Sequence, residues 1–300
     1  MGLAAIGLLA LAASGAAAAT SDGLEAAVTN AMLQEGDSAR GLSVSEKQER
    51  TQTNVERTSE DNKWAFGTAV IEAPKKEGYY PEGWLFVAQK SGGTWKVGLE
   101  GTPEFSTLAE DAPDSVVDDG EKEMFSRSGG LELQSTSTGL QLPWKRGVRW
   151  KMSGGPHGWS TGYDRPYSAL DLTGGSGKVR AAGRGRVYTM CSTNRGWIRV
   201  YHPNGYSTDY YHLRKNIKPR DGRRIRAGAF LGYTGTDVSC GGSASGRHVH
   251  FALLRGDRHV ALDNKTIGGW TFQQGAAYKG YAKHKTIKRF PPNGLLRNYG

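Results

Sequence analysis

The stretch Ser239-Cys-Gly-Gly-Ser-Ala-Ser-Gly-Arg-His-Val-His-Phe-Ala-Leu-Leu254 joins a glycine- and serine-rich loop to an alternating apolar run. From His248 onward the alternation has the two-residue period of a half-buried β-strand. His248 and His250 therefore project from one face of the predicted strand, and the apolar side chains between and after them from the other. Two imidazoles about 7 Å apart can reach one ion or one substrate atom together. The same pattern also fits two exposed strand histidines, so residues elsewhere must decide between the two readings.

The sequence around this strand is dense in short β-like runs and turns. His202-Pro-Asn-Gly205 carries the Asn-Gly hairpin signal and leads into a run in which Tyr206, Thr208, Tyr210 and His212 would share one face. No helix longer than a turn or two is predicted after Gly139. Further strands are predicted at 179–182, 185–190, 197–201 and 228–235.

The first half of the chain has a different character. A weak helical spacing at residues 24–32 precedes strand-like runs at 64–71, 83–89 and 94–99, the last two joined by a Ser-Gly-Gly turn. An acidic connector, residues 110–123, shows no core-building pattern. We therefore predict a mostly β protein, in which antiparallel sheets with a narrow groove follow an α+β or β-rich segment.

Charge divides the chain sharply. Residues 1–127 hold 21 acidic and 11 basic side chains, whereas residues 128–300 hold 8 acidic and 28 basic ones. This asymmetry favours a detachable acidic pro-segment, residues 20–127, and a basic working domain, residues 128–300. Processing is expected between Arg127 and Gly139. Two permanent domains of different surface charge are the alternative.

The N-terminus, residues 1–19, is apolar and ends in a run of small residues, which is typical of a secretory signal peptide. It lacks the usual basic start, and a transmembrane helix is the competing interpretation, but the run is short and rich in Gly and Ala. We expect a secreted, extracellular protein without stable membrane insertion. In such a protein Cys191 and Cys240, which are the two cysteines of the chain, are expected to pair.

Two upstream residues complete a possible metal site. His157 ends the glycine-rich loop Gly154-Gly-Pro-His157, and Asp171 lies inside the apolar run Ser168-Ala-Leu-Asp-Leu172. A carboxylate in an apolar run is costly to bury unless it is paired, hydrogen-bonded or bound to a metal. Backbone N–H groups alone could also satisfy it.

Taken together, these motifs resemble a known family. His157, then Ser-x-Leu-Asp171, then Tyr-Tyr-His212-Leu, then Gly-Arg-His248-Val-His250-Phe is similar to the lysostaphin-type zinc endopeptidases, in particular the β-lytic and staphylolytic bacterial enzymes. The resemblance covers residues 139–281, with four motifs in the family's order. A second, C-terminal disulfide of those relatives has no counterpart here.

The resemblance implies a role for each motif residue. His157, Asp171 and His250 match the ligands of one Zn²⁺ ion, and His212 and His248 match the two catalytic histidines. Two imidazoles and a carboxylate leave zinc a fourth position for water, as a catalytic site requires. Because no His-Glu-x-x-His helix supplies a Glu base, the two other histidines are the candidates to accept the proton of the water.

Other residues receive weaker roles. Tyr211 and Tyr278 resemble tyrosines near the groove of staphylolytic relatives, so we name them as candidate substrate-binding residues, although strand tyrosines are often packing residues. His202 is expected to be solvent-exposed beside its turn, and His259 and His284 lie in basic, polar surroundings. The resemblance also implies a disulfide between Cys191 and Cys240.

The predicted function is that of a secreted zinc metalloendopeptidase, made as a zymogen, that hydrolyses peptide bonds in bacterial peptidoglycan, in particular beside glycine. The pro-segment would inhibit it by covering the groove, since that segment has no cysteine to offer a metal. Two alternatives stay open: a non-enzymatic wall-binding or regulatory module on the same fold, and a general secreted protease of Gly-rich proteins.

The partners follow from charge and motifs. The basic half suits an anionic surrounding such as a bacterial wall. Nucleic acid is not expected, because the sequence contains no zinc-finger, helix-turn-helix or RNP-type aromatic motif. We expect the protein to act as a monomer on peptidoglycan peptides.

Overall fold

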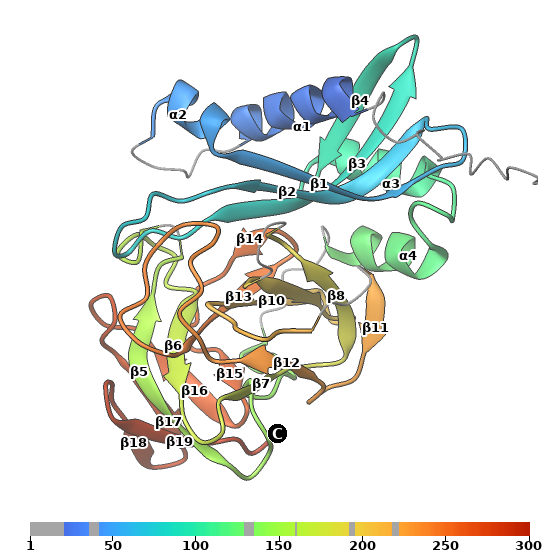
Figure 1. Ribbon diagram of the computed structural model, residues 1–300. Coiled ribbons are helices and arrows are strands. Elements are labelled where there is room, and N and C mark those ends of the chain that lie inside the picture. The colour runs from blue at the N-terminus through green and yellow to red at the C-terminus, as the bar shows by residue number, and fades with distance from the viewer. Residues whose placement is uncertain (1–20, 36–41, 129–134, 160, 192–195, 218–221) are drawn as a thin grey trace, which may run out of the picture.

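The computed structural model describes residues 21–35, 42–128, 135–159, 161–191, 196–217 and 222–300 (Figure 1). The predicted signal peptide lies outside the described residues, as do residues 129–134 of the predicted processing region. None of the helices in the described ranges combines the length and the apolar character that a membrane crossing requires.

The N-terminal segment, residues 21–128, is an α+β unit built on a four-stranded sheet in the order β1-β2-β3-β4. Successive side chains of a strand point to opposite faces of the sheet, and β2 shows this alternation. Phe66 and Val70 belong to one hydrophobic cluster. Ala65, Ala69 and Ile71 belong to another cluster on the opposite face. The predicted helix and strands of this segment are confirmed. Its elements are α1 (Ser21–Glu35), α2 (Val44–Glu49), β1 (Thr51–Thr58), β2 (Trp64–Ile71), β3 (Glu82–Ser91), β4 (Thr94–Leu99), α3 (Pro103–Asp111) and α4 (Asp119–Ser128).

The prediction for the acidic connector 110–123 is wrong. Its middle packs into a core, with Val116 and Val117 fully buried, and its two ends belong to α3 and α4. The sequence did not predict this burial, because the apolar residues of the segment are few and stand between acidic ones. No periodicity of a helix or strand is therefore visible. The apolar side chains fill the space between this sheet and the C-terminal part.

The C-terminal part, residues 135–300, is mostly antiparallel β and, within its described residues, contains no helix, as predicted. Nine strands form one sheet with the path β11-β8-β9-β10-β13-β6-β5-β19 and β14 paired to β13. Two small sheets, β12-β7 and β15-β16-β17-β18, accompany it. The strands are β5 (Arg149–His157), β6 (Ala169–Thr173), β7 (Lys178–Arg180), β8 (Gly185–Thr189), β9 (Ile198–Tyr201), β10 (Tyr206–Tyr211), β11 (Arg223–Ile225), β12 (Phe230–Tyr233), β13 (Val249–Arg255), β14 (Arg258–His259), β15 (Thr266–Ile267), β16 (Trp270–Gln273), β17 (Tyr281–His284), β18 (Ile287–Arg289) and β19 (Gly294–Arg297).

The central strand β13 sets the position of the predicted site. It pairs with β10 on one side and β6 on the other, so His250 lies opposite both Tyr211 and Asp171. Directly opposite residues point to the same face of a sheet. The register therefore brings two of the predicted ligands together before any side chain is considered.

The two parts of the chain meet over a shared hydrophobic cluster. Side chains from the N-terminal sheet, such as Leu85 and Val87, pack in one cluster with Trp197, Tyr201 and Leu254 of the C-terminal part. Figure 1 shows the four-stranded sheet lying above the strands of the C-terminal part. The predicted disulfide is confirmed: Cys191 and Cys240 are bonded, with their Cα atoms 6.2 Å apart.

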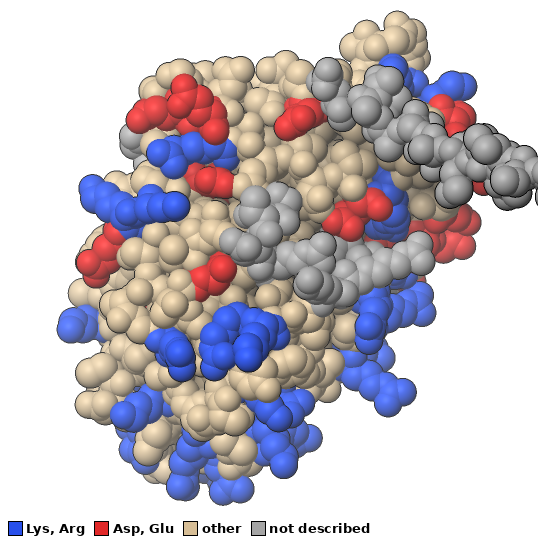
Figure 2. Space-filling model, in the orientation of Figure 1, with Lys and Arg blue, Asp and Glu red and all other residues tan. Residues whose placement is uncertain are grey.

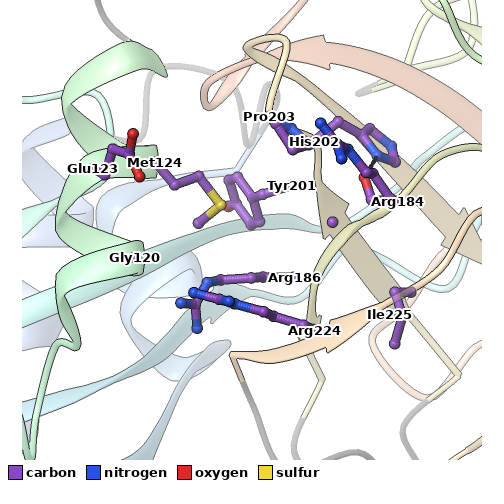
Figure 3. Close-up of a pocket in the computed structure, with 11 residues that line it drawn as sticks. Gly120, Glu123, Met124, Arg184, Arg186, Tyr201, His202, Pro203, Arg224 and Ile225 are labelled. Atoms are coloured by element: carbon purple, nitrogen blue, oxygen red, sulfur yellow. Dashed lines mark hydrogen bonds between the residues drawn. The ribbon is translucent and has the colours of Figure 1, made fainter.

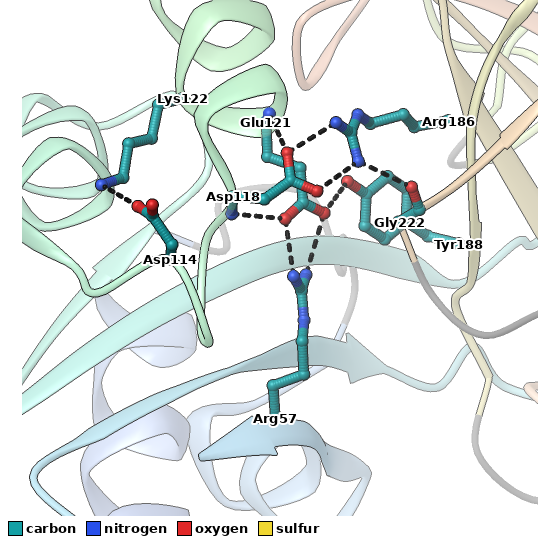
Figure 4. A network of polar contacts seen from close by, with 8 residues as sticks. All are labelled: Arg57, Asp114, Asp118, Glu121, Lys122, Arg186, Tyr188 and Gly222. Atoms are coloured by element: carbon teal, nitrogen blue, oxygen red, sulfur yellow. Dashed lines mark hydrogen bonds and ion pairs between the residues drawn. The ribbon is translucent and has the colours of Figure 1, made fainter. Parts of the chain in front are cut away.

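Charges also cross this interface (Figure 4). Glu121 of α4 is fully buried and accepts two hydrogen bonds from Arg57, at 2.6 and 2.9 Å, and one from the Tyr188 hydroxyl at 2.7 Å. Arg186 of β8 donates to both oxygens of Asp118, at 2.8 and 2.6 Å. In Figure 2 the acidic side chains gather over the N-terminal segment and the basic ones over the C-terminal part.

Replacing Glu121 with alanine should therefore weaken the docking of the two parts. The change leaves Arg57 and the Tyr188 hydroxyl without their acceptor, at an expected cost of about 3 kcal/mol of unfolding free energy. Asp114→Ala is the matched control, because its pair with Lys122 at 3.1 Å lies on the surface and should contribute about 0.5 kcal/mol. Urea unfolding measures both variants, and equal losses would contradict the role given to Glu121.

A second buried carboxyl group, that of Glu100, makes the stability of the folded protein depend on pH. Burial raises the pKa of Glu100 to about 7, with Asp257 nearby adding to the effect and Arg199 opposing it. The Tyr201 hydroxyl donates a hydrogen bond to this carboxyl group. A carboxyl group whose pKa is raised in the folded protein stabilises it below about 4.5 and loses that contribution as the pH rises through about 7.

Glu100→Gln copies the protonated form and should remove this pH dependence. We expect the variant and the parent chain to unfold at the same urea concentration near pH 4.5, and the variant to be the more stable at pH 8. A constant difference between the two proteins at both pH values would show that Glu100 does not titrate in this window.

Candidate metal and catalytic site

The three predicted ligands lie together. His157 Nε2, Asp171 Oδ1 and His250 Nδ1 form a triangle with sides of 3.3, 2.9 and 3.7 Å. Four ligands about 2.05 Å from a tetrahedral zinc ion would be about 3.3 Å apart. The donor atoms of the triangle are thus spaced as one zinc ion requires.

The elements explain why these side chains converge. Asp171 lies on β6 and His250 on β13 in directly paired positions, and His157 is the last residue of β5. The β5–β6 pairing is irregular, with register shifts between Met152 and Gly154 and between Gly154 and His157. A Cβ on Gly154 would lie 2.5 Å from Asp171 Oδ2, so this position needs glycine for the carboxylate to fit.

The two predicted catalytic histidines border the triangle. His248 Nε2 is 3.4 Å from Asp171 Oδ1, and the His212 and His248 rings have centroids 4.7 Å apart. His212 and His248 also lie with His250 in a second group of three possible ligand atoms, all within 4.8 Å of one another. His250 belongs to both groups, so the five residues form one cluster.

Hydrogen bonds decide how the rings are oriented. His157 Nδ1 donates to the Gly155 carbonyl at 2.7 Å, His212 Nδ1 to the Asp237 carbonyl at 2.7 Å, and His248 Nδ1 to the Gly246 carbonyl at 2.8 Å. Each bond fixes the tautomer and leaves Nε2 as an acceptor. The Nε2 atoms of His212 and His248 are buried and have no hydrogen-bond partner in the described part of the chain.

Burial and charge keep the ligands in the form that a metal needs. Burial lowers the pKa of His157 and takes that of His250 to about 4, so both rings are neutral at pH 7. Burial alone would raise the pKa of Asp171, but the imidazoles of His157, His248 and His250 hold it below its usual value. Metal ligands bind as neutral imidazole and ionised carboxylate, and the directions of these pKa shifts favour that state.

The strand pattern did not predict how His212 reaches the cluster. Alternation along β10 would place His212 on the face of Tyr210, away from His250. His212 instead follows the end of the strand with a φ of 64°, in the left-handed region that a non-glycine residue seldom adopts. This turn brings His212 to the side of the sheet on which His250 lies, and its ring stacks on Tyr211 with centroids 4.4 Å apart.

The two predicted tyrosines occupy different positions. Tyr278 stacks on His157 with ring centroids 4.0 Å apart, so it lies at the metal triangle. Tyr211 is fully buried, and its hydroxyl donates to the Gly241 carbonyl at 2.7 Å. A role of either residue in binding substrate stays a prediction.

His202 and His284 lie away from the cluster, whereas His259 stacks on Trp159, whose ring centroid is also 4.9 Å from that of His250. His202 is buried, not exposed as predicted, because its ring is bonded to the Arg184 carbonyl and the Thr208 hydroxyl at 2.9 Å each. It lines a cavity of about 270 Å³ between α4 and the strands β8, β9 and β11, together with Arg184, Arg186 and Arg224 (Figure 3). That cavity includes none of the five cluster residues.

A loop of the N-terminal segment lies against the cluster, and sequence reasoning did not identify it. Residues 72–81 connect β2 to β3, and the Tyr80 ring stacks on His250 with centroids 3.9 Å apart and planes 12° apart. The Tyr80 hydroxyl is hydrogen-bonded to that of Tyr278. Two tyrosines thus cover two of the three predicted ligands.

The backbone of this loop is held along the C-terminal part. Ala73 N donates to the Cys240 carbonyl at 3.0 Å, and Gly242 N donates to the Pro74 carbonyl at 3.0 Å. A Cβ on Gly241 would lie 2.0 Å from the Ala73 carbonyl oxygen, so glycine at 241 lets the second chain approach. At the other end of the loop, the Trp159 indole donates to the Pro81 carbonyl at 2.7 Å.

Comparison with known proteins identifies the family of the C-terminal part. Residues 165–262 match the model of peptidase family M23, and the chain therefore contains an M23 peptidase domain. It is 31% identical over 156 residues to Protease LasA of Pseudomonas aeruginosa, which is 48% of this chain and 36% of LasA. It is 28% identical over 141 residues to Beta-lytic metalloendopeptidase of Lysobacter enzymogenes, or 44% of this chain and 77% of that one. The chain thus spans about a third of the length of LasA.

Among solved structures, the M23 metalloprotease pseudoalterin is 31% identical, with 53% of this chain and 98% of that chain covered and a TM-score of 0.47. The catalytic domain of lysostaphin from Staphylococcus simulans is 20% identical, with 35% and 78% covered and a TM-score of 0.26. The predicted family is confirmed, and Asp171, His212, His248 and His250 lie within the matched residues.

Proposed function

We propose that the protein is a zinc metalloendopeptidase with His157, Asp171 and His250 as ligands and His212 and His248 as catalytic residues. The triangle of donor atoms, with sides that bracket the spacing of a tetrahedral zinc site, carries this proposal. Membership of peptidase family M23, whose members depend on zinc, supports it. A zinc ion held there would supply a Lewis acid for a carbonyl oxygen and acidify a water molecule toward neutral pH.

The remaining steps belong to the side chains of the chain itself. Burial lowers the pKa of His212 well below its usual value, with the nearby His248 and His250 adding to the effect, so its ring is neutral and can accept a proton at Nε2. The His248 ring lies beside it, with centroids 4.7 Å apart, and His248 Nε2 is 3.4 Å from Asp171 Oδ1. One ring would orient the attacking water and take its proton at Nε2, and the other, in its protonated form, would donate from Nε2 to the oxygen that becomes negative.

The N-terminal segment would keep this site inactive. A substrate carbonyl has to approach the space between the ligands and the two catalytic histidines, and Tyr80 lies over His250 within 5.9 Å, centroid to centroid, of the His212 ring. We propose that residues 20–127 form the inhibitory part of a zymogen, and that cleavage between Arg127 and Gly139 leads to its release. Secretion after removal of residues 1–19 is part of the same proposal.

The proposed substrate is peptidoglycan, cut at bonds beside glycine. The loop that lies along the site supports the glycine preference, because a Cβ on Gly78 would be 2.6 Å from the Thr161 carbonyl oxygen. A substrate peptide bound where this loop lies would have the Thr161 carbonyl oxygen equally close to its backbone, which leaves no space for a Cβ. The names of the matched relatives, a protease and a metalloendopeptidase, agree with cleavage of peptide bonds.

The decisive experiment is to incubate the processed protein with purified cell walls of defined cross-bridge composition and to identify the new amino termini. We expect new termini at glycine, and none with His248→Ala. Release of termini only from soluble Gly-rich proteins would instead indicate a general protease. Wall binding without new termini would indicate a non-enzymatic module.

A further inference from the structure

The C-terminal end of the chain carries many cations and no acidic residue. Residues 264–300 contain seven Lys and Arg side chains and no Asp or Glu. We call the exposed pairs Lys283–Lys288 and Arg149–Arg297, on β17–β18 and β5–β19, the cationic face. Figure 2 shows the blue side chains gathering over this lower end of the molecule.

The pairing of like charges on this face is unusual. Lys283 stands directly opposite Lys288, and Arg149 directly opposite Arg297, on neighbouring antiparallel strands. Side chains in such positions have Cβ atoms about 5 Å apart, and like charges there destabilise a sheet. A chain selected for stability alone would place an acidic residue in one position of each pair.

Nothing in the described part of the chain neutralises these four cations, since no ion pair there involves them. Their neighbours are aromatic rings instead. Lys288 Nζ lies 4.8 Å from the centroid of the Tyr281 ring, and the Arg297 guanidinium lies 5.9 Å from that of Tyr299. The hydrophobic cluster that the acidic N-terminal segment shares with the C-terminal part includes side chains of β8, β9, β10 and β13 and none of β5, β17, β18 or β19.

Exposed rings accompany the cations. Phe290 is 56% exposed and packs against Tyr281 with centroids 5.3 Å apart, and Tyr299 is 39% exposed. Flat apolar rings of this kind can stack on the C–H faces of sugars, while paired ammonium or guanidinium groups hold a carboxylate between them. The combination of rings and paired cations suits a polymer that alternates sugar rings with acidic groups.

We infer that the cationic face is a binding surface for an acidic polysaccharide whose sugars carry carboxylate groups. Its strand β17 is close to the site along the chain, because Tyr278, which stacks on His157, is followed by Lys279 and then by β17. The surface extends beyond the proposed peptidase function and does not depend on it.

Binding of the full chain to polygalacturonate, with neutral dextran as the reference polymer, tests this inference. We expect binding to polygalacturonate that falls steeply between about 50 and 200 mM salt, and none to dextran. Lys283→Glu should weaken binding about tenfold, and its unfolding temperature should be equal to or above that of the parent chain because a Lys–Lys pair becomes a Glu–Lys pair. Arg297→Glu repeats the test on the second pair.

Lys178→Glu is the matched control, since this exposed lysine lies on β7 of a separate sheet and the substitution changes net charge by the same amount. It should change affinity by less than about twofold. Equal losses for the Lys178 and Lys283 variants would overturn the inference, because they would assign binding to net charge alone. Tighter binding to single-stranded DNA than to polygalacturonate, compared at the same concentration of negative charges on the polymer, would overturn it as well.

Discussion

Tyr80→Ala should activate the uncleaved chain. Tyr80 is buried, stacks on His250 and is hydrogen-bonded to Tyr278, so it is the side chain that anchors the loop over the site. Truncating a buried aromatic anchor typically costs about 2 kcal/mol, which would raise the population of the uncovered site roughly 30-fold. Hydrolysis of a glycine-rich peptide by the intact, zinc-loaded chain is the measurement, and the rate should rise by about that factor.

Tyr79→Ala is the control for this experiment. Tyr79 is the neighbouring residue of the same loop, and its ring lies 5.3 Å from Lys76 Nζ, within the loop itself. We expect the Tyr79 variant to stay as inactive as the parent chain. An equal gain in both variants would mean that general loosening of the loop is responsible, and no gain in either would remove Tyr80 from the inhibitory contact.

His248→Ala, made in the Tyr80→Ala chain, should abolish turnover and leave zinc in place. General acid–base catalysis by a positioned histidine contributes about 10²- to 10⁴-fold, and we expect the rate to fall by about 10³-fold. Bound zinc, measured by metal analysis of the same samples, should stay at the parent level, because His248 lies outside the ligand triangle.

His284→Ala is the matched histidine control. His284 lies on β17, stacks on Tyr299 and is bonded to the Gly269 carbonyl, away from the cluster. Its loss should change neither the rate nor the zinc content. If His248→Ala kept the full rate, the catalytic role of His248 would be wrong; if it lost the zinc, the assignment of ligands would be wrong.

Much of the fold could be predicted from the sequence, because β-strands impose a simple alternation. The His248-x-His250 pattern correctly places both histidines on one face, and pairing of β13 with β6 then brings Asp171 opposite His250. His157, at the end of β5, completes the triangle. The order of the motifs indicated that His157 is a ligand, but no local sequence pattern could predict its position in space. Long-range register, set by the whole sheet, supplied that contact.

The predictions that failed concern residues whose positions depend on backbone turns or on partners far away in the sequence. His212 leaves the alternation because its backbone turns to a positive φ, which no sequence period reveals. His202 is buried because the Arg184 carbonyl and the Thr208 hydroxyl bind its ring, and these partners come from other strands. The position of Tyr80 depends on how two separately folded sheets dock. Its one sequence signal is the Gly78-Tyr79-Tyr80-Pro81 loop, where glycine and two aromatic residues interrupt an acidic segment.

The central claim is that one zinc ion is held by His157, Asp171 and His250, and zinc content measures it most directly. The full chain should bind about one zinc per molecule, as should His248→Ala and His212→Ala, whereas His157→Ala, Asp171→Ala and His250→Ala should each lose it. Circular dichroism would confirm that the variants stay folded. Zinc retained by the three triangle variants, or lost equally with His212→Ala and His248→Ala, would contradict the account.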